Sequence, residues 1–381
     1  MLKGENGISN LNNDIIIYLF LKMNELEAKN VFNEFKRDES SISYYGKIIG
    51  KGAYGQVREV RLNNSKKLLA AKLIRKDDDD KLGEIKFIDR LKNNNIIKIN
   101  QVIKKTIERR TYYLIIMEKA MLRDLGKLSE FFFRHNLLKL INDEKVETFD
   151  ERIGDNLLRF YSKQIIDGMK HLDDNYLVHF DIKPENLLIT LDLVIKLSDF
   201  GLLTRIKDED LIRIPGGTQG FLTREYYKKD KLSKEDAKKQ DYFSLGSTLF
   251  YLKYGEHMLK YKKLDEPSYN AFRITQLLDK KISFIQSRPL TEKNFIDFIC
   301  KLIQYDPIDR PNFEGIYRDK WLNKNLDIIT ALSFIYESDE EKLIMELQKS
   351  DYLIKKKKES NSKCKKFKFK KKNSVKIQEE K

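Results

Sequence analysis

The stretch VHFDIKPENLL, at residues 178–188, places three functional groups on one short loop. Asp181 offers a proton acceptor, Lys183 a cation, and Asn186 an amide oxygen that can bind a metal. Apolar residues flank these groups and would anchor both ends of the loop. Phosphoryl transfer asks a protein mainly for positioning and for stabilisation of charge. The loop therefore predicts a phosphoryl-transfer centre, if the other parts of such a centre occur elsewhere in the chain.

A glycine-rich turn lies upstream, where residues 50–57 read GKGAYGQV. Gly50, Gly52 and Gly55 have the spacing Gly-x-Gly-x-x-Gly, which in a dinucleotide-binding site opens a helix. Here extended sequence precedes and follows the glycines. We therefore expect a strand–loop–strand hairpin whose backbone N–H groups can approach phosphates closely. Taken alone, the segment also fits a plain glycine-rich hairpin.

The next apolar strand, LLAAKLI at residues 68–74, contains a single lysine, Lys72. A lysine among core residues is unfavourable unless it is paired. Residues 83–91 follow with apolar residues at helical spacing, and Glu84 is the candidate partner of Lys72. The alternative interpretation of Glu84 is an ordinary surface glutamate.

The triplet Asp199-Phe200-Gly201 directly follows the predicted strand VIKLS at residues 194–198. An aspartate at this position supplies a hard oxygen ligand of the kind that Mg²⁺ requires. β-Branched and aromatic runs at 95–99 and 111–117 complete a small antiparallel sheet. A buried helix over 157–173 leads into the opening loop, and a helix near residues 24–35 docks on the surface.

The motifs, in this order, resemble the eukaryotic-type protein kinase family, serine/threonine branch, over residues 44–323. Later landmarks agree: GTQGF at 217–221 with Thr223-Arg224-Glu225 after it, DYFSLG at 241–246, and DPIDRP at 306–311, whose arginine would pair with Glu225. The resemblance implies an α+β, bilobal protein-kinase fold with a small antiparallel β-sheet N-lobe that carries one helix and a larger, mainly α-helical C-lobe. The expected boundaries are an N-terminal extension (1–43), N-lobe (44–117), hinge (118–120), C-lobe (121–323), helical extension (324–354) and basic disordered tail (355–381).

The resemblance also implies the cofactors ATP and Mg²⁺ and, as acceptors, Ser or Thr hydroxyls of protein substrates. Lys72 would hold the ATP phosphates and Glu84 would orient it. Asp181 would accept or orient the hydroxyl proton, and Lys183 would neutralise charge on the moving phosphoryl group. Asn186 and Asp199 would bind Mg²⁺. The glycine hairpin would cover the phosphates, and the adenine site would be formed by Val57, Ala70, Met117, Glu118, Ala120 and Leu188.

The chain departs from the family pattern at Phe180, where the family has arginine. In kinases with that arginine, the cation receives a phosphate on the activation loop. Between the Asp-Phe-Gly triplet and Thr223, only Thr204 and Thr218 carry hydroxyls. The two absences predict a kinase that is independent of activation-loop phosphorylation. The altered corner at Thr223-Arg224 removes no catalytic group.

Two further carboxylates, Asp124 and Glu185, occupy positions that meet substrate arginines in basophilic members of the family. Solvated surface carboxylates are the alternative. For the whole chain, the alternatives are a pseudokinase scaffold that binds partners without phosphotransfer, or an electrostatic nucleic-acid binder. The complete charged set favours an active enzyme over the scaffold.

The charge of +15 is concentrated in the tail, because residues 355–381 hold thirteen lysines and three glutamates. Such a tail can contact an acidic partner, nucleic acid or a lipid surface. The alternative is a solvated tail without a dedicated partner. Cys300 and Cys364 have no metal-ligand spacing. The longest apolar run, seven residues at 15–21, is far below the roughly 20 that span a bilayer. We therefore expect no transmembrane segment and an intracellular protein, cytoplasmic or nuclear.

Overall fold

The computed structural model describes eleven stretches of the chain, which divide into two compact units. The described residues are 28–35, 42–52, 55–63, 67–75, 83–131, 153–206, 211–228, 231–259, 276, 279–287 and 292–326. The first unit comprises Met1–Lys119, His171–Phe180 and Ser198–Ile206, and the second comprises the remainder. Within the described stretches, no helix is long and apolar enough to cross a membrane. The predicted basic tail and nearly all of the helical extension lie outside them.

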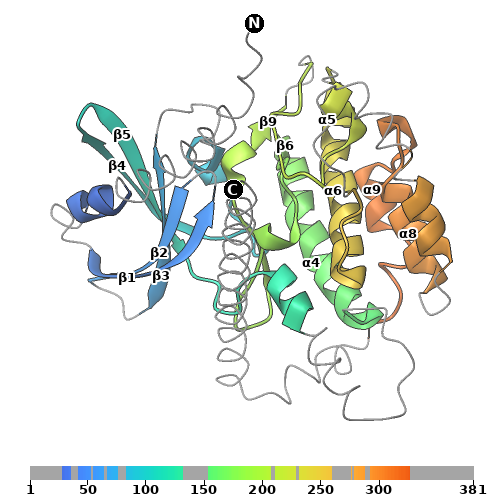
Figure 1. Cartoon of the computed structure of the whole chain (residues 1–381), viewed down its shortest axis with the longest axis horizontal. Helices are drawn as coiled ribbons and strands as arrows, with labels where there is room; N and C mark the ends of the chain where they lie inside the picture. Colours follow the sequence, from blue (N-terminus) through green and yellow to red (C-terminus); the bar gives the residue numbers. More distant parts are fainter. Residues whose placement is uncertain are drawn as a thin grey trace, which may run out of the picture. The chain divides into compact units, whose positions relative to one another are not determined.

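A five-stranded antiparallel sheet forms the first unit, with strand order β1-β2-β3-β5-β4 (blue to teal in Figure 1). The strands are β1 (Ile42–Gly52), β2 (Gly55–Leu62), β3 (Leu68–Arg75), β4 (Ile99–Ile107) and β5 (Arg110–Glu118). The glycine-rich segment is the β1–β2 hairpin, in which Gly52 pairs with Gly55. The strand–loop–strand arrangement expected from the sequence is therefore present, and no helix follows the glycines.

The β4–β5 hairpin turns on two residues, Glu108 and Arg109, between the paired Ile107 and Arg110. Both turn residues have positive φ, 47° and 64°. This is the backbone geometry that matches the right-handed twist of the flanking strands, although glycine or asparagine usually adopts it. The pairing along β4 and β5 therefore fixes the turn more strongly than local preference does.

A short helix at residues 28–35 covers one face of this sheet. Its side chains Val31, Phe32 and Phe35 are at most 3% exposed and share a core with Ile42 and with Val60, Leu69, Ala71, Leu73, Tyr112, Leu114 and Ile116. Basic residues of the sheet contact the helix as well: Arg58 lies 5.0 Å from the centre of the Phe32 ring, and Lys105 donates to the Glu34 carbonyl at 2.7 Å. The predicted N-terminal extension thus contributes residues to the core of the sheet unit.

The first unit also contains five short elements around the sheet. These are α2 (Gly83–Lys86), the 3₁₀ helices η2 (Ile88–Arg90) and η4 (Phe200–Leu202), and the paired strands β6 (Leu177–Val178) and β9 (Thr204–Arg205). The helix expected over 83–91 is broken at Phe87, whose φ and ψ of −120° and 16° are not helical. Gly83 allows α2 to approach η4, because a Cβ atom there would lie within 2.8 Å of the Leu203 carbonyl oxygen.

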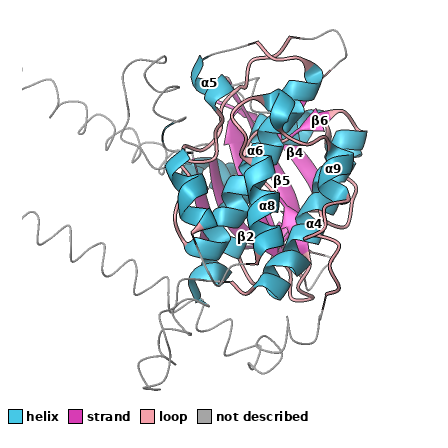
Figure 2. Cartoon of the chain, turned by 90° about the vertical axis from the view of Figure 1, so that its right-hand side faces the viewer, coloured by secondary structure: helices cyan, strands magenta, loops and turns pink. Residues whose placement is uncertain are grey.

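The second unit is mainly helical, and its helices are the cyan elements labelled in Figure 2. It contains most of α4 (Asp155–Asp174), α5 (Arg224–Lys228), α6 (Lys234–Tyr254), α8 (Lys293–Leu302) and α9 (Phe313–Tyr317). Helices at 125–131 and 279–286, the 3₁₀ helices η3 (Pro184–Asn186) and η5 (Pro307–Asp309), and the paired strands β7 (Leu187–Ile189) and β8 (Ile195–Leu197) complete its described part. The expected α+β architecture, with a sheet unit and a helical unit, is confirmed.

Helix α6 is buried over most of its length. Such a helix needs small residues where neighbours approach closely, and Gly246 meets this need: a Cβ atom there would lie 2.9 Å from both Leu302 and Ile303. Ser233 caps the N-terminus by accepting from the Asp236 N–H. Helix α6 also carries Gln240 and Ser244, which bond to residues 221–223 as described below.

The packing of residues 28–35 predicts that this helix stabilises the sheet unit. Truncation of the fully buried Phe35 to alanine should lower the free energy of unfolding by about 3–5 kcal/mol, as is typical for a buried phenylalanine. The measurement is equilibrium unfolding in urea. The matched control is Asn33→Ala on the exposed side of the same helix. Equal stability of Phe35→Ala and Asn33→Ala would contradict a role of the helix in the core.

Candidate active site

The first unit brings Lys72, Glu84 and Asp199 together around one ammonium group. Lys72 Nζ lies 2.6 Å from Glu84 Oε1 and 2.7 Å from Asp199 Oδ1. The Lys72 side chain is 8% exposed and that of Glu84 is 3% exposed, whereas that of Asp199 is 29% exposed. The lysine of β3 is therefore paired as the apolar surroundings require, and one of its carboxylates still reaches solvent.

The charge of Lys72 is set by these neighbours. Burial by itself lowers the pKa of the ammonium group, but the charges and hydrogen bonds of Glu84 and Asp199 outweigh it and raise the pKa above its ordinary value. Lys72 therefore carries a full positive charge at neutral pH. Glu84 Oε1 also accepts from the Phe200 N–H at 3.0 Å, so the same carboxylate holds the Asp-Phe-Gly segment.

Three predicted adenine-site residues lie on the sheet. Val57 pairs with Gly50 on one side and with Lys72 on the other, and Ala70 pairs with Met117. Ala70 and Met117 are buried at 6% and 8% exposure. Because side chains alternate along a strand, Ala70 and Lys72 project from the same face of β3. The face that carries the lysine is thus also the face with the predicted apolar contacts.

An ion pair that sequence reasoning missed links the hinge to β2. Lys119 lies between the predicted hinge residues Glu118 and Ala120, and its Nζ is 2.8 Å from Glu59 Oε1. Both side chains are nearly buried, at 14% and 9% exposure. Glu59 pairs with Ala70 in the sheet. Lys119 therefore fastens the end of β5 to the strand that follows the glycine turn.

In the second unit, Asp181 collects three hydrogen-bond donors. Lys183 Nζ donates to Oδ2 at 2.7 Å, Asn186 Nδ2 donates to the same oxygen at 3.1 Å, and the Thr218 hydroxyl donates to Oδ1 at 2.7 Å. Lys183 also donates to the Thr218 hydroxyl at 2.6 Å. Asp181 is buried at 4% exposure. Its carboxylate is thus fixed in orientation, and Oδ1 accepts a hydrogen bond from the aliphatic hydroxyl of Thr218.

Asn186 and Asp199 are the predicted metal ligands, and each is placed within its own unit. Asn186 Nδ2 donates to the carbonyl and carboxylate of Asp181, which directs the amide oxygen away from that group. Asp199 has positive φ, 62°, and presents a partly exposed carboxylate beside Lys72. Both side chains supply hard oxygen donors, which fit a small divalent cation. The described residues contain no group of three or more His, Cys, Asp and Glu that could hold a metal ion.

The remaining predicted adenine-site residues lie at the strand ends and in the second unit. Glu118 ends β5, where its N–H donates to the Lys98 carbonyl and its carboxylate accepts from the Lys98 N–H. Ala120 is the first residue of the second unit and is half-buried. Leu188, in β7, bridges to Asp124.

Phe180 is fully buried at 1% exposure and has positive φ, 64°. A positive φ is rare for a bulky residue and persists only where surrounding packing imposes it. The division between the two units passes directly after this residue. An apolar buried side chain offers no charge to a phosphate.

The altered corner Thr223-Arg224-Glu225 has partners for each side chain. Thr223 bonds to Gln240, Arg224 pairs with Asp306, and Glu225 pairs with Arg310 at 3.1 Å. The Glu225–Arg310 pair is the one expected from the sequence, and its side chains are 4% and 1% exposed. Thr223 and Arg224, which depart from the family pattern, therefore both have polar partners within the second unit.

Asp124 and Glu185 both belong to the second unit. Burial raises the pKa of Asp124 to about 6, and the nearby Glu185 charge adds to this effect, whereas the Lys127 N–H bond and charge oppose it. Asp124 accepts from the Lys127 N–H at 2.9 Å. Glu185 is exposed. The pair forms an acidic spot beside the loop that carries Asp181.

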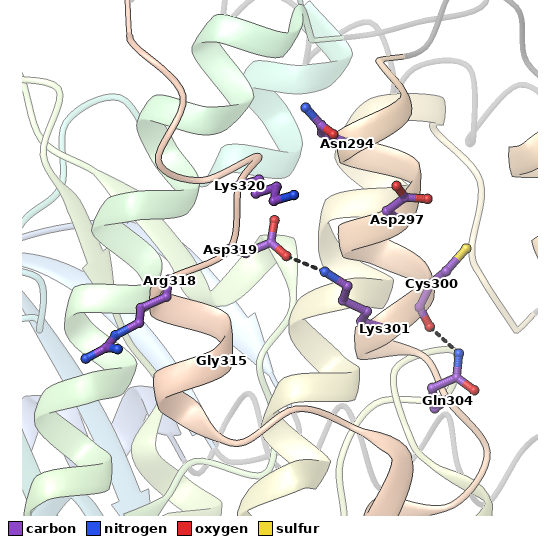
Figure 3. Close-up of a pocket in the computed structure, with 9 residues that line it drawn as sticks. All are labelled: Asn294, Asp297, Cys300, Lys301, Gln304, Gly315, Arg318, Asp319 and Lys320. Atoms are coloured by element: carbon purple, nitrogen blue, oxygen red, sulfur yellow. Dashed lines mark hydrogen bonds and ion pairs between the residues drawn. The ribbon is translucent and has the colours of Figure 1, made fainter.

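A separate surface pocket of about 540 Å³ lies between α8 and α9 (Figure 3). Its Lys301 pairs with Asp319 at 2.8 Å, and none of the predicted site residues lines it. Burial raises the pKa of the Cys300 thiol in this pocket, and the Asp297 charge adds to the shift, so the thiol stays protonated. The pocket therefore has no evident part in the chemistry.

Comparison with known proteins agrees with this arrangement. Residues 44–322 match the family model described as protein kinase domain. A probable serine/threonine-protein kinase of Dictyostelium discoideum is 29% identical over 278 residues, covering 71% of this chain and 49% of the relative. Serine/threonine-protein kinase plk-1 of Caenorhabditis elegans is 25% identical over 291 residues, covering 74% and 40%. Serine/threonine-protein kinase PSK2 of Saccharomyces cerevisiae is 28% identical over 292 residues, covering 72% and 23%.

The matched region thus spans half or less of each of these relatives. Within this chain it includes residues of both units, from Tyr44 in β1 to Leu322. The match covers well over half of the chain and contains every residue predicted for catalysis, cofactor binding and metal binding. The chain belongs to the protein kinase domain family.

Proposed function

We propose that this protein is an active serine/threonine protein kinase that transfers the γ-phosphate of ATP, bound with Mg²⁺, to Ser or Thr hydroxyls of protein substrates. The observation that carries this function is the orientation of the Asp181 carboxylate by Lys183, Asn186 and Thr218. These groups come from separate segments and converge on one carboxylate, an arrangement suited to orienting an incoming hydroxyl beside a cation. The serine/threonine names of the relatives support the choice of acceptor.

The sheet unit supplies the groups for ATP. Lys72 is fully charged and held in place by Glu84, so it can bind phosphate oxygens without reorganising. The β1–β2 hairpin offers glycine backbone N–H groups for the same phosphates. Val57, Ala70 and Met117 would form part of the adenine surface, and Lys119 would hold the hinge against β2.

The helical unit supplies the groups for the acceptor. Asp181 Oδ1 would accept the hydrogen bond of the substrate hydroxyl and orient the attacking oxygen. Lys183 would stabilise negative charge on the phosphoryl group as it leaves ATP. Asn186 and Asp199 would hold Mg²⁺, which when bound neutralises charge on the ATP phosphates.

Independence from activation-loop phosphorylation is part of this proposal. Each hydroxyl between Asp199 and Glu225 already has a hydrogen-bond partner: Thr204 donates to the Leu202 carbonyl, Thr218 to Asp181, and the buried Thr223 to Gln240. Residues 207–210 lie outside the described stretches and carry no hydroxyl in their sequence, KDED. Phe180 provides no cation to receive a phosphate. The roles of the basic tail and an intracellular location remain predictions from the sequence.

Replacement of Asp181 tests the catalytic assignment. Asp181→Asn keeps the shape of the side chain but removes its basicity, and should reduce transfer of labelled phosphate from ATP to casein by roughly 10²- to 10⁴-fold. Asp192→Asn, at an exposed aspartate of the same unit, is the matched control and should retain activity. Equal labelling by the wild type and Asp181→Asn would contradict the assignment. Binding of ATP without any transfer by the wild type would instead identify a pseudokinase scaffold.

Phosphatase treatment tests the proposed mode of regulation. The purified kinase, treated with a broad-specificity protein phosphatase that is then removed, should phosphorylate casein as fast as untreated protein, because no activation-loop phosphate contributes to its active state. Mass spectrometry of the treated protein checks that phosphate is absent. Loss of activity on treatment, with recovery after rephosphorylation at Thr204 or Thr218, would disprove it.

The Lys119–Glu59 ion pair should support ATP binding. Lys119→Met removes the charge from a nearly buried pair and leaves Glu59 without its closest partner, so we expect a several-fold higher KM for ATP, in line with the roughly 1–3 kcal/mol typical of charged hydrogen bonds. The control is Lys92→Met, at an exposed lysine of the same unit. The exchanged variant Glu59→Lys with Lys119→Glu should recover part of the loss. An unchanged KM for ATP in Lys119→Met would count against the role given to the pair.

A further inference from the structure

A buried polar network in the second unit contacts the segment 217–222, which contains the GTQGF sequence. Its members are Thr223, directly after that segment, and Gln240 and Ser244, one turn apart on α6. All three are at most 1% exposed. Buried polar side chains are favourable only when their hydrogen bonds are satisfied. Each of these three side chains therefore needs hydrogen-bond partners within the unit.

The Gln240 side chain makes four hydrogen bonds. Its Oε1 accepts from the Thr223 hydroxyl at 2.6 Å and from the Thr223 N–H at 3.2 Å. Its Nε2 donates to the Phe221 carbonyl at 3.1 Å and to Ser244 Oγ at 2.8 Å. An amide side chain has two acceptor and two donor positions, so every one of them is used. The Thr223 N–H can only donate, which fixes the amide oxygen on that side.

Ser244 is the third member of the network. Its hydroxyl accepts from Gln240 and donates to the Phe221 carbonyl at 2.8 Å. The Phe221 carbonyl thus receives two side-chain donors from α6. Three polar side chains together hold the backbone at Phe221 and Thr223 against a helix that is itself buried over most of its length.

The backbone of Phe221, which α6 holds, is hydrogen-bonded to that of Thr218. The Phe221 N–H donates to the Thr218 carbonyl at 3.1 Å, which closes a turn over residues 218–221. Thr218 in turn places its hydroxyl between Asp181 and Lys183. An unbroken series of hydrogen bonds therefore runs from α6 through Phe221 to the carboxylate proposed as the proton acceptor.

We propose that Thr223, Gln240 and Ser244 are positioning residues that hold the segment 217–222 in the conformation that receives the protein substrate. This inference rests on the proposed kinase function and extends it to residues that touch neither ATP nor the acceptor. The three side chains act through Phe221 and Thr218. Their loss disturbs use of the protein substrate and leaves ATP binding in the sheet unit unchanged.

The experiment compares substrate and ATP kinetics in variants of the full chain. Gln240→Leu removes all four bonds at similar volume, and Thr223→Val removes only the hydroxyl. Each should lower kcat/KM for casein by roughly five- to a hundred-fold, as expected for buried groups left without hydrogen-bond partners, with KM for ATP unchanged. Thr223→Ser keeps the hydroxyl and should retain wild-type kinetics.

A second matched pair separates positioning from packing. Ser244→Ala removes a hydroxyl that bonds to Phe221, whereas Ser162→Ala removes an equally buried hydroxyl that bonds within α4, to the Leu158 carbonyl. Thermal unfolding of every variant confirms that it folds. Of these two variants, Ser244→Ala should lower kcat/KM for casein and Ser162→Ala should not.

The outcomes distinguish the inference from the proposed function. Wild-type activity with unchanged casein kinetics in Thr223→Val and Gln240→Leu would overturn the inference alone. So would a parallel change in KM for ATP, because it would indicate a general loss of structure. A wild-type protein that transfers no phosphate overturns the proposed function and the inference together.

Discussion

The buried ammonium group of Lys72 is the constraint on which the sheet unit depends. A charge in an apolar strand is tolerated only with close counter-charges. Glu84 and Asp199 provide them from 12 and 127 residues away in the sequence. One cluster of charges therefore fixes α2 and the Asp-Phe-Gly segment against β3. Gly83 allows the necessary approach, and Glu84 adds a bond to the Phe200 N–H. The group proposed to bind phosphate is thus also the one whose interactions organise this unit.

In the helical unit, hydrogen bonds organise the residues around Asp181. Asp181 is oriented by a cation, an amide and a hydroxyl, and the hydroxyl is itself positioned from α6. The departures at Thr223 and Arg224 make sense only with their partners, Gln240 and Asp306. A threonine buried without Gln240 would leave a hydroxyl unsatisfied. Thr223 and Arg224 therefore both have partners within the unit, beside the Glu225–Arg310 pair.

Phe180 bears on the proposed independence from activation-loop phosphorylation. It occupies the position of a phosphate-binding cation with a buried aromatic ring, and the hydroxyls of the following segment bond within the protein. In this arrangement the catalytic loop is held by packing and by Thr218, with no added phosphate.

The sequence by itself determined most strands of the sheet, the glycine hairpin and the identity of the charged residues, because local patterns and motif order encode them. It also indicated that Lys72 needs a partner. The run at 95–99, expected to be a strand, contributes only Ile99 to β4. Only the tertiary structure decided that Lys119 pairs with Glu59, that Gln240 satisfies Thr223, and that residues 28–35 complete the core of the sheet. These contacts join segments that are far apart in the sequence, so no local spacing of residues predicts them. The helix expected over 83–91 is divided at Phe87, whose backbone is not helical, into α2 and η2.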